Sequence, residues 1–258
     1  LRIVPALKRV ETAFVAVPSP EAALNLFSRV MESGADVIAF ELIIGECMEI
    51  VSRNGIGIRI PLPVGSPWYV MVELAAAHPS VPLREMLEDT LAAGVEADEV
   101  LDAAIAENEG QRAMIWRIRE DWPDCGRREA PTINTDTAVP VSAVPEFCAR
   151  VKAALAARWP EGRLIAIGHA GDGNIHVSLM APSGTAYDDW SARARDAEGV
   201  VNAIAVELGG SFSAEHGIGQ SKRHAMATHK DAVALDLMRA VKGVIDPRGM
   251  MNPGKMLP

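Results

Sequence analysis

The stretch RLIAIGHAGDGNIHVSLM, residues 163–180, predicts two strands joined by a tight turn. Apolar and β-branched residues flank a run of glycine and small polar residues on both sides. Glycine, Asp and Asn tolerate the backbone conformations that such a turn requires. His169 and His176 stand at the two rims of the turn. The stretch therefore predicts a β-hairpin with two imidazoles facing each other across it.

Two histidines placed in this way can form half of a metal site. Facing residues of a hairpin have Cβ atoms about 4.5–5.5 Å apart, and two imidazoles can bind one ion at about 2.0–2.1 Å. A candidate third ligand is Glu215, which precedes His216 in GGSFSAEHGIGQSKR, residues 209–223. If the backbone is extended there, neighbouring side chains point to opposite sides. Glu215 would then complete a His-His-Glu site while His216 faces a substrate; the alternative is two polar turns without a ligand.

Helical and extended patterns alternate along the rest of the chain in two halves, about 1–129 and 130–258. The expected strands are 11–18, 35–43, 67–77, 133–141, 163–167, 175–180 and 210–214, and the expected helices are 20–33, 82–95, 107–122, 142–158, 187–208 and 230–244. Ser19 suits a helix N-cap and Pro20 the first helical position. The β-α-β-β-α-β order predicts an α+β fold, an antiparallel sheet with helices on one face.

Composition narrows the functional classes. The 258 residues are 49% hydrophobic and 23% charged, as in an ordinary globular protein. A net charge of −9 without a basic run argues against a nucleic acid or an anionic membrane as partner. The cysteines, Cys47, Cys125 and Cys148, form no CxxC pair and predict a reduced, cytoplasmic protein. No apolar run approaches the roughly 18 residues of a membrane span. The start, LRIVPAL (1–7), reads as a strand without an initiator Met and predicts a fragment of a longer chain.

Several blocks of the sequence resemble one family. GHAGDGNIHVSLM, SAEHGIGQSKR and DPRGMMNPGKML closely resemble three blocks in the C-terminal domain of FAD-linked oxidases. These are the relatives of D-lactate and D-2-hydroxyglutarate dehydrogenases and of the glycolate oxidase flavin subunit. VETAFVAVPSPEAAL, AFELI, PWYVMVEL, IWRIRE and VPVSAVPEF resemble the same domain in order, so the resemblance covers nearly the whole chain. It implies an α+β fold whose ferredoxin-like halves form a large antiparallel sheet.

The resemblance also implies a site. The family's divalent metal, often zinc, would be held by His169, His176 and Glu215. His216 would be the catalytic base, and Asn174 and Arg119 would bind the substrate, Arg119 through a carboxylate; without the resemblance, Arg119 reads as an exposed helix residue. Asn252, in the closing block, would lie at the FAD cofactor.

The implied activity is oxidation of a 2-hydroxy acid to a 2-oxo acid with hydride transfer to flavin. FAD would be bound mainly by an N-terminal domain outside this sequence, so the fragment alone is expected to be inactive. The electron acceptor and the oligomeric state, for which a homodimer is one option, stay open. Two other classes also stay open: a metal-dependent hydrolase, which would use the same ligands and a metal-bound water, and a non-catalytic metal-binding module.

The sequence departs from the family at two positions. Asn134 stands where dicarboxylate-specific relatives carry a lysine, and Pro123 stands where they carry a hydroxyl residue. Both changes remove contacts to a distal carboxylate. We therefore expect a preference for a 2-hydroxy acid with one carboxylate, or for a short dicarboxylate reached by Arg119, over D-2-hydroxyglutarate.

Overall fold

A computed structural model describes residues 6–258, and one antiparallel sheet of eight strands organises them. The first half supplies β1 Arg9–Val17, α1 Pro20–Glu32, β2 Asp36–Ile44, α2 Gly45–Asn54, β3 Trp68–Ala76, α3 Leu83–Glu96 and β4 Asp102–Ile105. Its strands lie in the order β4-β1-β3-β2, with every neighbouring pair antiparallel. This is the β-α-β-β-α-β arrangement predicted from the sequence, with α2 added.

The second half repeats the arrangement with a shorter sheet. It follows α4 Glu109–Glu120 and α5 Trp122–Glu129 and contains β5 Thr132–Asn134, β6 Thr137–Ala138, α6 Val144–Arg158, β7 Arg163–His169, β8 Asn174–Met180, α7 Tyr187–Ser191 and α8 Ala194–Glu207. β8 pairs with β7 on one side and with β5 and β6 on the other. The edge strands β2 and β7 of the two halves pair, with Glu41 opposite His169, which makes one continuous sheet.

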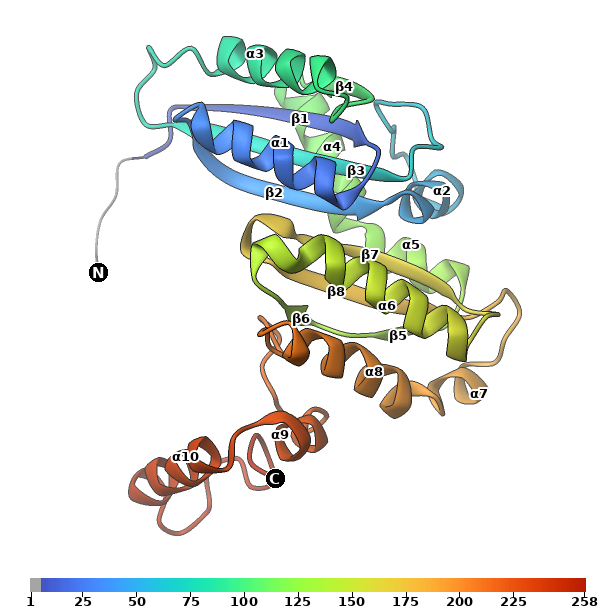
Figure 1. Cartoon of the computed structure of the whole chain (residues 1–258), viewed down its shortest axis with the longest axis vertical. Helices are drawn as coiled ribbons and strands as arrows, with labels where there is room; N and C mark the ends of the chain where they lie inside the picture. Colours follow the sequence, from blue (N-terminus) through green and yellow to red (C-terminus); the bar gives the residue numbers. More distant parts are fainter. Residues whose placement is uncertain (1–5) are drawn as a thin grey trace.

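Local sequence explains the first helix. The side chain of Ser19 accepts the N–H of Ala22 at 3.2 Å, and Pro20 occupies the first helical position, as predicted. Leu26 and Val30, one turn apart, are fully buried against the sheet. α1 and α6 lie in front of the sheet in Figure 1, and α4 lies behind it. The fold class is confirmed, but the helices are not confined to one face, because β3 is buried on both faces and α4 covers the far one.

Several element boundaries differ from the expectations. The strand expected over 133–141 divides into β5 and β6, because Thr135 and Asp136 turn their polar groups to neighbouring segments. The strand expected over 210–214 reduces to one bridge between Ala138 and Ser211. The helix expected over 187–208 is two helices, α7 and α8. The bounds of β4, the closing strand of the first half, were not predicted, and neither were α2, α5 and α9 Arg223–His229. Of the strand expected at 1–7, the first five residues lie outside the described part of the chain.

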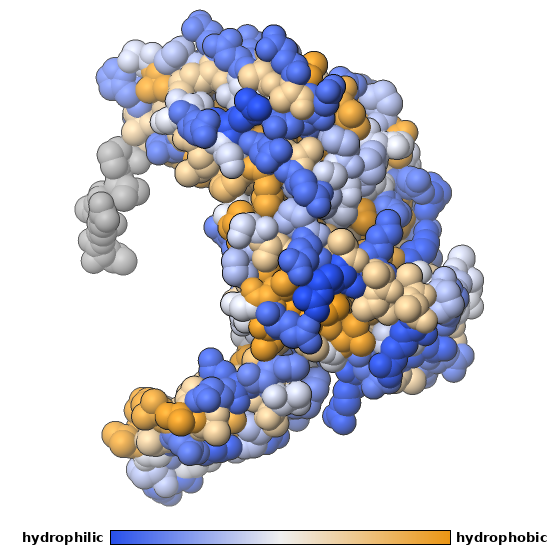
Figure 2. Space-filling view, viewed as in Figure 1, coloured by the Kyte–Doolittle hydropathy of each residue, from blue (hydrophilic) through white to orange (hydrophobic). Residues whose placement is uncertain are grey.

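The C-terminal arm, residues 223–258, extends away from the sheet (Figure 1). It comprises α9, α10 Ala232–Ile245 and the closing segment. Ala225, Met226 and Leu235 of the arm form a small core with Phe212, which precedes it in the chain. Apolar side chains are exposed on α10 and gather at the free end of the arm in Figure 2, among them Val241, Val244 and Ile245. Within residues 6–258, no helix has both the length and the apolar character that a bilayer span needs.

Candidate functional site

The hairpin predicted from the sequence is present and carries both histidines on one face of the sheet. Its turn requires glycine at position 173, because φ is +74° and a Cβ there would lie 1.9 Å from the Val139 carbonyl oxygen. The register pairs His176 with Ile167 rather than with His169, which lies two residues further along β7. The expected direct opposition of the two histidines is therefore wrong by two residues. The two imidazole rings still come within 6.0 Å of each other, centroid to centroid.

Glu215 lies between the two imidazoles. Its carboxylate oxygens are 3.2 Å from Nε2 of His176 and 3.8 Å from Nε2 of His169. The Nδ1 atoms of both rings face other carboxylates: Glu41 hydrogen-bonds Nδ1 of His169, and Oδ1 of Asp136 lies 3.7 Å from Nδ1 of His176. Metal-binding histidines are commonly oriented in this way, with the second nitrogen toward a carboxylate. The arrangement brings the three predicted metal ligands together.

Asp136 organises the segment that carries Glu215, and sequence reasoning did not select it. Its Oδ2 accepts the backbone N–H groups of Ala214, Glu215 and His216 at 3.1, 3.1 and 2.9 Å, and the Lys222 ammonium at 3.2 Å. Burial opposes its ionisation, but these donors outweigh burial and lower the pKa of the Asp136 carboxyl. Its one sequence signal is its place two residues after Asn134, inside the segment expected to form a strand over 133–141.

The same hydrogen bonds change the expected direction of His216. Three successive N–H groups converge on one oxygen, so the backbone bends at 214–216 and neighbouring side chains do not point to opposite sides. The His216 ring stacks on His176 at 5.3 Å, with its side chain 61% exposed. Ligand atoms of Asp136, His176, Glu215 and His216 all lie within 4.8 Å of one another. This four-residue cluster differs from the predicted set by including Asp136 and His216 and by omitting His169.

Glu41, a second residue that sequence reasoning missed, holds Arg119 at the edge of this cluster. Nε of Arg119 donates to Oε2 of Glu41 at 2.8 Å, and the Arg119 side chain is only 17% exposed, so it is not a solvated helix arginine. Burial opposes ionisation of Glu41, but the contacts of His169 and Arg119 outweigh it and lower the pKa of the Glu41 carboxyl. The hydrogen bond to Glu41 in turn raises the pKa of His169. For His176, burial and the nearby Arg119 charge lower the pKa and favour the neutral ring.

A cavity of about 330 Å³ opens beside these residues. It is lined by Arg119, Trp122, Pro123, Gly126, Arg127, Thr132, Asn134, Thr135, Ile167, His176, Ser178, Glu215 and His216. Asn174, predicted to bind substrate, is buried on β8 and is not among the lining residues; its Oδ1 has no hydrogen-bond partner among the described residues. The cavity combines a cluster of ionisable groups with an apolar wall, as ligand sites commonly do.

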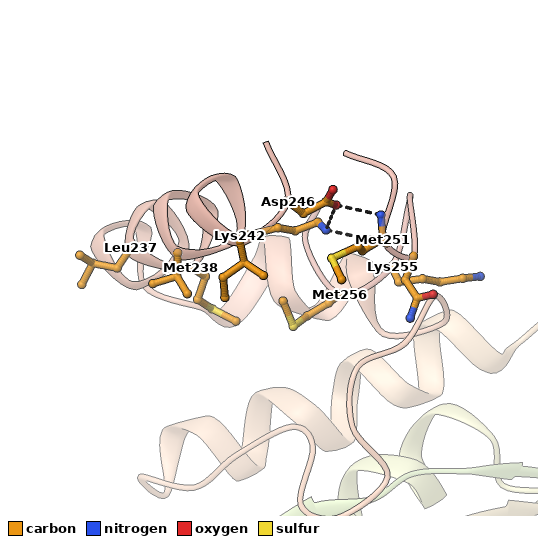
Figure 3. Close-up of a pocket in the computed structure, with 10 residues that line it drawn as sticks. Leu237, Met238, Lys242, Asp246, Met251, Lys255 and Met256 are labelled. Carbon is orange, nitrogen blue, oxygen red and sulfur yellow. Dashed lines mark hydrogen bonds and ion pairs between the residues drawn. The ribbon is translucent and has the colours of Figure 1, made fainter. Parts of the chain in front are cut away.

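Asn252 lies elsewhere. It lines a groove of about 540 Å³ between α10 and the closing segment, in the C-terminal arm. Figure 3 shows this groove, with Leu237, Met238 and Met256 along it and Lys242 bonded to Asp246 and to the Met251 carbonyl. The structure therefore does not bring Asn252 to the histidine cavity, because the arm leads away from the sheet (Figure 1).

Comparison with known proteins identifies relatives of the whole chain. A family model described as FAD linked oxidases, C-terminal domain, matches residues 6–256. D-2-hydroxyglutarate dehydrogenase of Xanthomonas citri pv. viticola is 31% identical over 94% of this chain and 50% of the relative. The mitochondrial D-2-hydroxyglutarate dehydrogenase of Rattus norvegicus is 31% identical over 98% of this chain and 46% of the relative. The chain thus spans about half the length of these relatives.

A solved structure supports the fold assignment. An alkyldihydroxyacetonephosphate synthase matches 99% of this chain and 46% of its own, with a TM-score of 0.57 and 12% sequence identity. At that identity the likeness concerns the fold alone. It agrees with the eight-stranded antiparallel sheet and its covering helices.

Proposed function

Because this chain belongs to the family of FAD-linked oxidase C-terminal domains, we propose that it is the substrate- and metal-binding domain of an FAD-dependent 2-hydroxy acid dehydrogenase. The relatives named D-2-hydroxyglutarate dehydrogenase support this class of reaction. They are about twice as long as this chain, which fits a flavin held mainly by a second domain. The observation that carries the proposal is the pair of histidines that share Glu215.

The described residues fit a divalent metal. Nε2 of His169 and Nε2 of His176 both face Glu215, while their Nδ1 atoms face Glu41 and Asp136. Nitrogen and carboxylate oxygen in this combination suit zinc and leave positions open for a substrate. Oδ1 of Asp136 is buried, makes no hydrogen bond among the described residues and faces Nδ1 of His176 at 3.7 Å, so it is placed to orient that ring while Nε2 faces the ion. His169, His176 and Glu215 would therefore hold the ion.

The chain's own residues can bind the substrate and move a proton. A bound metal would supply Lewis acidity toward a 2-hydroxy carboxylate, and a flavin would supply a hydride acceptor. The imidazole of His216, exposed beside Glu215, can accept the hydroxyl proton. Arg119, fixed by Glu41, can bind a carboxylate through its remaining guanidinium nitrogens. Trp122 and Ile167 give the cavity an apolar wall.

The test uses the full-length protein that carries this domain, purified with its flavin. A panel of D- and L-2-hydroxy acids (lactate, glycolate, malate and 2-hydroxyglutarate) is offered with a dye as artificial electron acceptor. We expect dye reduction that matches 2-oxo acid formation mole for mole with at least one of them. Flavin-loaded protein that oxidises none of them would overturn the proposal, and ester or amide hydrolysis without dye reduction would favour the hydrolase alternative.

A further inference from the structure

The cavity extends well beyond the histidine cluster along β8. His176 and Ser178 line it from β8, and Asn134 and Thr132, which pair with Ser178 and Met180, line it from β5. An antiparallel strand rises about 3.4 Å per residue, so the levels of His176 and Met180 are about 14 Å apart. A two- or three-carbon hydroxy acid held at the histidines fills only one end of this space.

At the far end of the cavity, the lining residues that come from β5 and β8 are polar but uncharged. Oδ1 of Asn134 accepts the Ser178 hydroxyl at 2.6 Å, and its amide nitrogen donates to Thr132 at 3.4 Å. The amide of Asn134 is thus engaged by its neighbours. These groups offer no cation to an anionic substrate tail.

The charge at this end comes from α5 instead. Pro123 and Arg127, one helical turn apart, both line the cavity, and Gly126 between them lies in van der Waals range of the Met180 methyl group at the end of β8. Arg119 and Arg127 are the two arginine or lysine side chains among the described residues that line the cavity. We propose that Arg127 is a specificity-determining residue that binds a second, distal carboxylate of the 2-hydroxy acid substrate. This inference rests on the proposed function.

The two arginines differ in how firmly they are held. Arg119 pairs with the buried Glu41, which fixes it at the histidine end. Arg127 is 70% exposed and pairs with Asp124 on its own helix, itself 60% exposed. Exposed ion pairs contribute little to stability, so Arg127 can exchange Asp124 for a substrate carboxylate at little cost. Arg127 thus offers a cation to a distal carboxylate, which the expectation drawn from Asn134 and Pro123 did not include.

The test compares two five-carbon substrates in the full-length, flavin-loaded protein. D-2-hydroxyglutarate carries the distal carboxylate, and D-2-hydroxypentanoate has a methyl group in its place. Arg127→Met should lower kcat/KM for hydroxyglutarate about 10- to 100-fold, the usual weight of a charged hydrogen bond, and leave hydroxypentanoate unaffected. Arg127→Lys should recover part of the loss. Arg128→Met removes the same charge from the next, exposed position outside the cavity and should change neither value.

Each other outcome overturns the inference in a distinguishable way. If the wild type oxidises both substrates but the ratio of their kcat/KM values is the same in Arg127→Met and Arg128→Met, Arg127 does not set specificity. The proposed function would still stand in that case. An equal loss on both substrates would give Arg127 a structural role, which thermal melting of the variant would reveal. If the wild type oxidises no 2-hydroxy acid, the proposed function fails and this inference fails with it.

Discussion

The two halves of the sheet each bury a carboxylate, and the two are satisfied very differently. Glu73 on β3, in the first half, accepts hydrogen bonds from Thr12 at 2.6 Å, from two nitrogens of Arg112 at 2.8 and 2.9 Å and from Trp116 at 2.8 Å. Both of its oxygens are used. Asp136, in the second half, receives four donors on Oδ2 and none on Oδ1 among the described residues.

The difference separates a structural cluster from a functional one. A buried polar group with every partner in place stabilises one arrangement of the chain and has no capacity left for a ligand. A buried oxygen without a partner costs free energy, and it persists where something else completes it. The first half thus holds α4 against the sheet through Glu73, while in the second half Oδ1 of Asp136 faces Nδ1 of His176 at 3.7 Å and can orient that ring toward the proposed ion.

The largest expected effect tests the second half directly. His169→Ala, His176→Ala and Glu215→Ala should each abolish stoichiometric metal binding, because each removes one of three ligands. The fold should survive, since these side chains lie at the turn and the 214–216 bend rather than in the core. Elemental analysis of the purified variants measures this. A variant that keeps one metal per chain removes its residue from the ligand set.

A variant of His216 distinguishes a catalytic base from a fourth metal ligand. His216→Asn should lower kcat of the full-length protein about 10²–10⁴-fold, the usual contribution of a general base, while the metal stays bound. The melting temperature should stay unchanged because the side chain is largely exposed. Loss of the metal in this variant would instead support the four-residue cluster of Asp136, His176, Glu215 and His216.

The first half should respond in stability rather than in activity. Glu73→Ala leaves Arg112 and Trp116 without their acceptor, and breaking such a buried pair costs about 3 kcal/mol. Glu109→Ala removes the other, exposed partner of Arg112 and should change stability little. Urea unfolding of both variants gives the comparison, and metal content should be normal in both. Metal loss in Glu73→Ala would contradict a purely structural role for Glu73.

Asp136→Asn should show a smaller, mixed effect. Asn keeps an acceptor oxygen but loses the charge that holds three backbone N–H groups and Lys222. Partners behind the ligands typically contribute 10- to 100-fold to metal affinity, so a weakening of about that size is expected. Competition with a chelator measures it. An unchanged affinity would mean that the 214–216 bend does not depend on the charge of Asp136.

The smallest effect is a pH dependence. The hydrogen bonds of Glu73 outweigh its burial and lower its pKa in the folded protein. Its contribution to stability is therefore fully present above the unfolded glutamate pKa of about 4.3 and is lost as the pH falls through the folded value. Wild type and Glu73→Gln should differ in unfolding free energy at pH 7 and converge in acid. A gap that stays constant down to pH 3 would contradict this origin.

The sequence by itself determined the elements that depend on neighbours in the chain. The cap at Ser19, the turn around Gly173 and the strands on either side of it follow from local backbone preferences and apolar patterning. The same local reading placed the three predicted ligands on two turns. It failed at His216, because it assumed an extended backbone where N–H groups bend around Asp136.

Only the tertiary structure decided which distant residues meet at the site. Glu41 reaches His169 because β2 and β7 pair at the junction of the two halves, and Asp136 reaches His216 across 80 positions of sequence. Arg127 reaches the cavity because α5 packs beside β8. Such contacts depend on how whole helices and strands pack against one another. The sequence around each residue does not indicate which distant residue it will contact. The turns that carry His169, His176 and Glu215 could therefore be predicted from the sequence, whereas their neighbours Glu41, Asp136 and Arg127 could not.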